Sequence, residues 1–372
     1  MNQSRSTRKT IFLFFVFFAL ILSIAAKAQA LEPKLLWEKK LPFKIYDLKM
    51  AAESGDVILS SKDARQIILY DKNGNKRFHW GPRVDRAPFG IDISADGSKI
   101  IYNTSWTAEY MEAKKLSFAG PFDSRIHYST RKGKELWNKK IEGGSYLSPD
   151  GTIIAVGPIG GEGKNLTLLD STGKILWKYI YEIGGASDVI FSPDSIDIGL
   201  CDEGVLRLLD RYGNLLFEKA QCQGIISISE GGSYISTNPY YELERSHKGR
   251  VYDKTGNIFF EGVGFVSANG QRLVLSLDAK TVIYSLPDKT ILKEYPIQGS
   301  ETAVSADGRF IVVMGKRTDT ASANNIFIID MQENGIWETY VIGSPKIFLT
   351  KDGKYLLIRI YQENKLVYYQ LY

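Results

Sequence analysis

Short apolar runs alternate with tight polar turns along the chain from residue 31 to its end. The stretch YLSPDGTIIAVG, residues 146 to 157, is a typical unit. Pro149 and Asp150 suit the two corners of a type I turn, and Gly151 accepts the positive φ that follows. Because the run from Thr152 to Val156 is apolar and β-branched, the stretch predicts a β-hairpin.

The same pattern recurs with different residues throughout the chain. A glycine, or in one unit a serine, occupies the turn at Gly55, Gly97, Gly151, Ser195, Gly232, Gly270, Gly308 and Gly353. Successive turns lie 37 to 54 residues apart. A period of roughly 40 residues that contains several strands is typical of a β-propeller.

A second hairpin follows the first in most units. Its turn carries an aspartate three residues before a glycine, and a large aromatic residue comes four positions after that glycine, as in DSTGKILWK at 170 to 178. Aspartate caps such a turn through the backbone, and glycine adopts its strained corner. Two hairpins per unit predict four-stranded antiparallel blades and an all-β fold.

The two ends of the chain decide how the ring closes. The last unit supplies three strands and stops at Tyr372, whereas LEPKLLWEKK at residue 31 matches the outer strands of other units. We therefore expect Leu35–Lys40 to pair with Lys365–Leu371, which removes the exposed edges of an open ring. Eight blades result, and a seven-bladed ring stays an alternative if the weak first unit is a lead-in.

Residues 1–30 lie outside this pattern. Arg5, Arg8 and Lys9 precede an apolar run from Ile11 to Ala26, and Ala28-Gln29-Ala30 has the small-x-small form of a cleavage site. This is typical of a secretory signal peptide, which predicts a periplasmic or secreted protein with one β-propeller domain over 31–372. An uncleaved membrane anchor is the alternative reading, and it would be the protein's link to a membrane.

The leader also carries most of the net charge. The whole chain has a formal charge of +5, of which the leader contributes four positive charges and no acid. The mature chain is therefore nearly neutral, at +1, and nothing in its charge favours a nucleic-acid partner. We expect a monomer.

Cys201 and Cys222 are the two cysteines of the chain. They fall at the end of strand b and just after strand d of the fourth unit, and these ends point to the same face of a blade. An oxidising compartment favours a disulfide between them. Two buried free thiols that pack as small apolar residues are the alternative.

The repeat D-x-x-G-x-x-x-W/F after an apolar strand resembles the repeats of quinoprotein-like propellers, a PQQ-repeat and WD40-like family of eight-bladed rings. The resemblance implies that Trp37, Trp137 and Trp177 dock between neighbouring blades. It covers the chain unit by unit, except that SLPDKTILKEY and DMQENGIWETY depart from it. The catalytic members of the family hold a quinone beside a vicinal cysteine pair, which this sequence lacks. The chain is similar to the non-catalytic branch, and we expect no cofactor.

The remaining sequence offers little for chemistry. His79, His127 and His247 fall in different units without metal-ligand spacing, and there is no G-x-S-x-G nucleophile elbow. The aspartates of the S-x-D-G turns suit backbone capping better than a calcium site. The glycine-rich GPIGGEGKN lacks the ending of a phosphate-binding loop, so we expect a plain connection there.

Long connections are the most informative feature. Strands b and c are joined by three long loops, at 103–127, 237–249 and 315–325, which share one face with the d-to-a connections. Loops on a rigid scaffold collect function, and aromatic residues mixed with arginine suit protein binding. The candidate partner-binding residues are Arg83, Arg86, Trp106, Tyr110, Tyr240, Tyr241, Arg245, His247 and Arg317. The alternative is that these side chains fold back and pack locally.

The sequence therefore favours an exported, non-catalytic scaffold that binds a protein or peptide through its long-loop face. A propeller enzyme is the alternative: a lactonase, a glycan lyase or hydrolase, or a small quinoprotein with scattered acids at the channel mouth. A sensor that binds a small ligand in the channel is a third reading. Fold alone does not choose between them.

Overall fold

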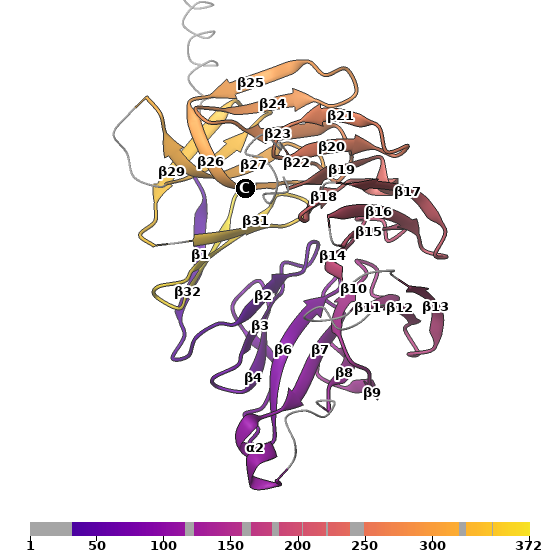
Figure 1. The fold of residues 1–372 in the computed structure, drawn as a ribbon. Coiled ribbons are helices and arrows are strands. Elements are labelled where there is room, and N and C mark those ends of the chain that lie inside the picture. The colour runs from indigo at the N-terminus through magenta and orange to yellow at the C-terminus, as the bar shows by residue number, and fades with distance from the viewer. Residues whose placement is uncertain are drawn as a thin grey trace, which may run out of the picture.

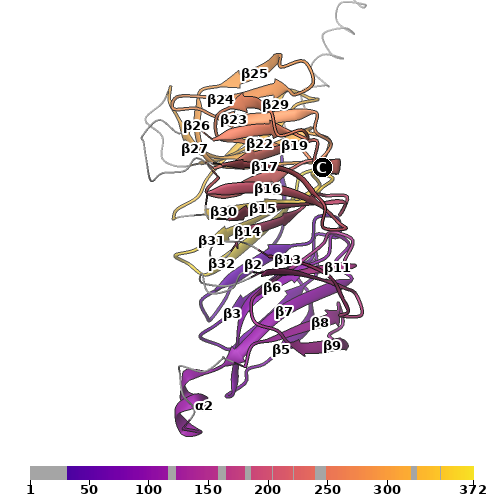
Figure 2. The same ribbon diagram turned by 45° about the vertical axis from the view of Figure 1, so that its right-hand side comes forward.

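The computed structural model describes residues 32–115, 123–157, 165–180, 186–202, 204–220, 222–238, 249–319, 325–343 and 345–372. Within them the chain forms eight four-stranded antiparallel sheets arranged as blades of a propeller (Figures 1 and 2). The prediction of an all-β, eight-bladed propeller is confirmed, and the seven-bladed alternative is wrong because the first unit forms a complete blade.

Each blade follows the order a, b, c, d from the channel outward. Blade 1 contains β2 (Asp47–Met50), β3 (Val57–Ser61), β4 (Gln66–Tyr70) and β5 (Lys76–Trp80). Blade 2 contains β6 (Arg86–Ile93), β7 (Lys99–Trp106), β8 (Arg125–Thr130) and β9 (Glu135–Lys140), with helix α2 (Ala108–Ala113) after β7. Blade 3 contains β10 (Gly144–Leu147), β11 (Ile153–Gly157), β12 (Asn165–Asp170) and β13 (Ile175–Ile180). Blade 4 contains β14 (Ala186–Phe191), β15 (Asp197–Asp202), β16 (Val205–Asp210) and β17 (Leu215–Ala220).

The second half of the ring repeats the arrangement. Blade 5 contains β18 (Ile225–Ile228), β19 (Tyr234–Thr237), β20 (Arg250–Asp253) and β21 (Ile258–Glu261), with the short η1 (Glu230–Gly232) in its first turn. Blade 6 contains β22 (Gly264–Val266), β23 (Arg272–Ser276), β24 (Thr281–Ser285) and β25 (Ile291–Tyr295). Blade 7 contains β26 (Ile297–Val304), β27 (Phe310–Arg317), β28 (Asn325–Asp330) and β29 (Gly335–Tyr340). Blade 8 contains β30 (Pro345–Leu349), β31 (Tyr355–Ile360), β32 (Lys365–Gln370) and β1 (Lys34–Lys40).

The first strand of the chain completes the last blade. β1 pairs antiparallel with β32, with Leu35 opposite Tyr369 and Lys40 opposite Lys365. In Figure 1 the indigo β1 lies beside the yellow strands of the C-terminal blade. The predicted closure is confirmed, so the ring is held together by the same main-chain hydrogen bonds as each blade.

The hydrophobic core is divided among the interfaces between blades. Eight clusters of buried apolar side chains are present, and each draws on two neighbouring blades, including blades 8 and 1. The nearly continuous burial of strands b and c, as in β11, β28 and β31, explains this, because a propeller blade buries both of its faces against neighbours. No single blade could bury its apolar residues alone.

The outer aromatic residue of one blade docks on the outer turn of the next, as the resemblance implies. The indole N–H groups of Trp37, Trp137 and Trp177 donate to the carbonyl oxygens of Lys72, Ser171 and Arg211, each at 2.9 Å. The turn glycine lies directly against the ring: a Cβ on Gly213 would stand about 3 Å from Trp177. Glycine is therefore required here both for its φ of 89° and for close approach.

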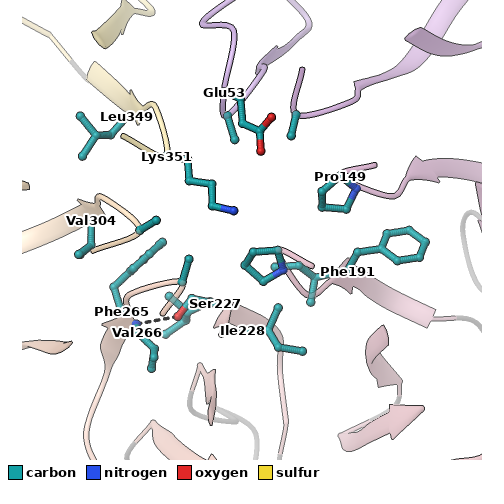
Figure 3. A pocket seen from close by; sticks show the side chains of 17 residues that line it. Glu53, Pro149, Phe191, Ser227, Ile228, Phe265, Val266, Val304, Leu349 and Lys351 are labelled. Atoms are coloured by element: carbon teal, nitrogen blue, oxygen red, sulfur yellow. Dashed lines mark hydrogen bonds between the residues drawn. The ribbon is translucent and has the colours of Figure 1, made fainter. Parts of the chain in front are cut away.

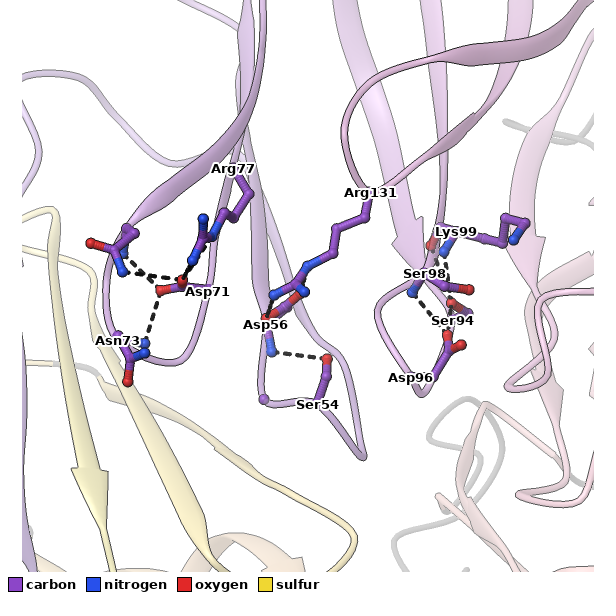
Figure 4. Close-up of polar contacts among 12 residues, drawn as sticks. Ser54, Asp56, Asp71, Asn73, Arg77, Ser94, Asp96, Ser98, Lys99 and Arg131 are labelled. Carbon is purple, nitrogen blue, oxygen red and sulfur yellow. Dashed lines mark hydrogen bonds and ion pairs between the residues drawn. The ribbon is translucent and has the colours of Figure 1, made fainter.

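A second contact between blades uses the residue that begins strand b or directly precedes it, which packs against the inner-turn glycine of the next blade. At two positions this residue is a buried aspartate paired with a cation of that next blade. Asp56 pairs with Arg131 (Figure 4), and Asp197 lies 3.7 Å from the amino group of Lys254.

Within the described residues no helix is long and apolar enough to cross a membrane.

Candidate functional site

Among the residues that the structure describes, the long-loop face carries one helical insertion, which lies in blade 2. After β7 the chain forms helix α2, which projects away from the ring in both views (Figures 1 and 2). Thr107 caps this helix, since its hydroxyl accepts from the N–H of Tyr110 at 3.2 Å and donates to the carbonyl of Val84 at 2.8 Å. The helix is thereby tied to the connection that enters blade 2.

Arg86 forms the base of this insertion. Its guanidinium pairs with the Asp123 carboxylate and donates to the Asp123 carbonyl at 2.8 Å. Both side chains are buried, and burial lowers the pKa of Arg86, with the neighbouring Arg125 acting in the same direction. The ion pair joins residues 37 positions apart, so it fastens the chain just before β8 to the first residue of β6. Arg86 thus has a structural contact rather than an exposed head group.

Above Arg86 the aromatic residues are partly exposed. The rings of Trp106 and Tyr110 are 5.9 Å apart and tilted, and the Arg86 guanidinium lies 6.0 Å from the Trp106 ring centroid. The amino group of Lys114 lies 6.0 Å from the Tyr110 ring. We call this group and the neighbouring residues of the connection into blade 2 the blade-2 patch: Arg83, Val84, Trp106, Tyr110 and Lys114.

Two surface ion pairs hold the edge of this patch. Arg83 makes a two-pronged contact with Asp85 at 2.9 and 3.1 Å, and its hydrogen bonds hold the pKa of Asp85 below the usual value. Arg65 pairs with Glu109 of α2 at 2.8 Å. Next to Arg83, the apolar side chain of Val84 is 80% exposed.

The other predicted residues do not join this patch. Arg317 ends β27 in blade 7, three blades away around the ring, where it pairs with Glu338 at 3.1 Å and Asp319 at 3.4 Å. Tyr240, Tyr241, Arg245 and His247 lie outside the described residues. Of the nine candidates, the structure therefore brings together Arg83, Arg86, Trp106 and Tyr110.

His127 belongs to a hydrogen-bonded chain behind the patch. Its Nδ1 is 2.7 Å from a Glu135 carboxylate oxygen, and its Nε2 is 3.0 Å from the Thr104 hydroxyl. This order of groups matches that of a catalytic triad. However, the Thr104 side chain is fully buried, and burial lowers the pKa of His127 although Glu135 opposes the shift. The imidazole is therefore neutral near pH 7, and it stacks on Tyr102 at 4.7 Å as part of the blade core.

The described residues contain no group of three or more His, Cys, Asp or Glu side chains placed to hold a metal ion. Cys201 and Cys222 have Cα atoms 6.0 Å apart, and their sulfur atoms are joined as a disulfide. Both cysteines are buried among apolar side chains of blades 4 and 5. The bridge would tie strand b of blade 4 to the connection that leads into blade 5.

A feature that the sequence did not indicate lies on the opposite face, where the inner turns meet around the channel. Each turn is hydrogen-bonded to the next, so that a closed belt of eight junctions surrounds the axis. The bonds are Glu53 N to Ala95 O (2.8 Å), Ala95 N to Pro149 O (2.7 Å), Asp150 N to Ser195 Oγ (3.1 Å), Gly231 N to Asp194 Oδ2 (2.6 Å), Glu230 N to Ala268 O (2.7 Å), Asn269 N to Ala306 O (3.0 Å), Ala306 N to Lys351 O (2.7 Å) and Lys351 N to Ala52 O (2.5 Å).

Inside this belt is a cavity of about 260 Å³ that opens to solvent. Its wall is mostly apolar, and Figure 3 shows the Glu53 carboxylate and the Lys351 amino group pointing into its mouth. The only sequence signal for this site was the small or apolar residue that precedes the turn aspartate or asparagine, as at Ala95, Pro149 and Ala268. That signal reads as ordinary turn chemistry until the eight turns are brought together.

Comparisons with known proteins agree with this architecture. No protein-family profile and no curated relative matches the sequence. Among solved structures, the chain is similar to BamB from Moraxella catarrhalis, with a TM-score of 0.59 and 14% identity over 91% of this chain and 100% of that one. It is similar to the C-terminal WD40 domain of Sif2, with a TM-score of 0.59 and 11% identity over 92% and 98%. The β-propeller domain of Myceliophteria thermophila Cps50 (Swd1) gives 0.53 and 8% over 92% and 100%. At such identities these likenesses show that the chain shares the β-propeller fold.

Proposed function

We propose that this protein is an exported, non-catalytic β-propeller scaffold of the quinoprotein-like kind, and that it binds a protein or peptide partner through its long-loop face. The observation that carries the proposal is the blade-2 patch. A short helix projects from the ring after β7, the buried Arg86–Asp123 pair lies at the base of the insertion, and the insertion carries Trp106 at the end of β7 together with Tyr110 and Lys114. Joining strands b and c of a blade does not require a helix, so helix α2 is an addition to the basic propeller fold.

The chemistry of the patch suits a protein partner. Tryptophan, tyrosine and arginine are the residues that most often dominate the energy of protein interfaces, and they do so when surrounded by contacts that exclude water. The rigid base means that little conformational freedom is lost on binding. Exposed Val84 adds apolar area next to the aromatic pair.

Two structural neighbours, BamB and the WD40 domain of Sif2, share the fold, and this supports the scaffold reading at the level of architecture. The leader sequence supports export. The buried position of Thr104 argues against the one triad-like arrangement in blade 2 as an active site.

Site-specific photocrosslinking in the cells that produce the protein tests the proposal. A photoreactive phenylalanine analogue at position 110 should yield a discrete covalent adduct. The same analogue at Tyr212, which is 76% exposed in an outer turn on the other face, is the matched control and should not yield it. Trp106→Ala should reduce the adduct at position 110. Equal adducts at both positions, or none at position 110, would contradict the assignment of the patch.

A further inference from the structure

The cavity inside the belt of inner turns is a second site, on the face opposite the blade-2 patch. We propose that it binds a peptide segment in which one large apolar side chain is flanked by lysine or arginine. The inference concerns different residues from the proposed function and stands or falls independently of it.

The shape of the site is fixed by the belt. Eight junctions link the turns into one ring, so the rim cannot open at one blade without breaking a main-chain or turn hydrogen bond. A cavity of about 260 Å³ is smaller than a typical drug-sized pocket, which holds roughly 300 to 1,000 Å³. It suits a single large side chain rather than an extended ligand.

The wall of the cavity calls for an apolar occupant. Ile190, Ile226, Phe265, Val304 and Leu349 line it from five consecutive blades, and each of them is partly exposed. In most blades the inner-turn residue at the rim of the cavity, which precedes the turn aspartate or asparagine, is an alanine or a proline and adds no polar side chain. Partly exposed apolar side chains that converge on one cavity gain from excluding water when an apolar group enters.

The charged side chains at the mouth of the cavity favour a positive charge next to the apolar side chain of the ligand. Lys351 of blade 8 reaches across to Glu230 of blade 5, with the amino group 3.3 Å from a carboxylate oxygen. Glu53 also points into the mouth, and its carboxylate contacts no hydrogen-bond or ion-pair partner among the described residues (Figure 3). Two carboxylates therefore face one ammonium group, and the uncompensated Glu53 favours a cation.

The surrounding face extends this preference beyond the cavity. The turn tips around the mouth carry Asp96, Asp150, Asp194, Asp307 and Asp352. Although partial burial acts to raise their pKa values, serine hydroxyl and backbone hydrogen bonds hold the pKa of Asp96 and Asp150 below normal, so both are ionised at neutral pH. A small amine could contact Glu53 but could not cover this ring of carboxylates, whereas a basic peptide can. The peptide is for this reason the favoured occupant.

Fluorescence anisotropy with a defined probe tests the site. The probe is a short labelled peptide with one phenylalanine between two lysines, tested beside versions with leucine or tryptophan as the apolar residue. We expect binding below 1 mM that weakens at least tenfold when the apolar residue becomes alanine, and that weakens further between 50 and 500 mM salt. Glu53→Gln should weaken binding about tenfold, and Ala268→Trp, which fills the mouth, should abolish it.

The controls separate this site from the rest of the surface. Glu112→Gln on helix α2 and Trp106→Ala should leave the affinity of the peptide unchanged. If no peptide of the series binds below 1 mM, or if Glu53→Gln and Ala268→Trp bind as the natural protein does, the proposal is wrong. If 3-phenylpropylamine binds as tightly as the peptide, the site takes small amines and the peptide assignment is overturned. Because Glu53→Gln is isosteric and exposed, the test does not depend on Ala268→Trp folding.

Discussion

Asp56, directly before strand β3 in blade 1, and Arg131 in the outer turn of blade 2 form an ion pair that joins two neighbouring blades (Figure 4). The guanidinium Nη2 donates to one carboxylate oxygen at 2.7 Å, and Nε lies 2.5 Å from the other. Asp56 is 1% exposed. Burial raises its pKa to about 6, even though Arg131 acts to lower it. The pair is therefore a place where the ring carries an incompletely compensated charge.

A pH dependence of stability follows from this pair. The pKa of Asp56 is about 6 in the folded protein and about 3.8 unfolded, so the folded state binds more protons between these values. Its contribution to stability is greatest below pH 3.8 and falls as the pH rises to 6. We expect Asp56→Asn to gain stability relative to the natural protein between pH 4.5 and 7.5, by on the order of 1–2 kcal/mol. Urea denaturation at both pH values measures this, and a constant difference between the two proteins would contradict it.

Arg83 and Arg86 are three residues apart, and we predict that their loss changes the free energy of unfolding by very different amounts. Arg86→Ala leaves the Asp123 carboxylate buried beside fewer cations, which should lower the free energy of unfolding by about 3 kcal/mol. Arg83→Ala removes an exposed ion pair and should change it by less than about 1 kcal/mol. Chemical denaturation of both variants tests the difference. Equal effects would show that the insertion does not depend on the buried pair.

The sequence predicted the fold because each turn requires particular residues. Aspartate, glycine and the aromatic residue after it sit at fixed spacing, and the units could be counted from them. The exceptions are instructive. Ser195, Lys289 and Asn334 adopt positive φ values of 62°, 58° and 54° where other units use glycine. Units six and seven resembled the repeat less well for this reason, yet both form antiparallel outer hairpins: β24 and β25 keep the register shift of the other blades, whereas β28 and β29 pair without one.

The candidate sites were harder to predict because they depend on distant residues. Arg86 reads as a loop arginine in the sequence, and its burial is decided by Asp123, which lies 37 positions away. The cavity of the inner turns requires one residue from nearly every blade, and no local pattern records their convergence. The sequence therefore indicated which face carries the insertion but not which side chains are free on it.

The link between Cys201 and Cys222 can be tested by thiol accounting. If the bridge forms in the exported protein, denatured protein should react with iodoacetamide after reduction but not before. The cysteines lie 21 residues apart, and closing such a loop stabilises a protein by about 3 kcal/mol in the chain-entropy model. Reduction should lower the melting temperature, whereas Cys201→Ala/Cys222→Ala should melt at the same temperature with and without reductant. Free thiols in the native, unreduced protein would favour the alternative reading.

Export predicts a defined mature N-terminus. Cleavage after Ala30 would give a protein that begins at Leu31, a few residues before β1. The intact mass of protein recovered from the periplasm or the medium should equal that of residues 31–372. Replacing Ala28 and Ala30 with bulky residues should block processing. Recovery of the full-length mass in the membrane fraction of the natural protein would instead support an uncleaved anchor.

Closure of the ring makes Trp37 of β1 the most sensitive residue of the first strand. Its ring stacks on Tyr368 at 4.9 Å, and its indole N–H donates to the Lys72 carbonyl in blade 1 at 2.9 Å. Trp37 therefore joins the first strand of the chain to the rest of blade 8, and it also joins blade 8 to blade 1. We expect Trp37→Ala to lower the free energy of unfolding by about 3 kcal/mol, since an aromatic contact and a hydrogen bond are both lost. Trp37→Phe should keep the stacking and cost about 1 kcal/mol.

Leu35→Ala is the matched control, because Leu35 lies on the same strand but is 50% exposed, and it should be nearly neutral. If Trp37→Ala and Leu35→Ala proved equally mild, the ring would be held by main-chain pairing alone, and docking of the aromatic residues would be a consequence of closure rather than a cause of its stability.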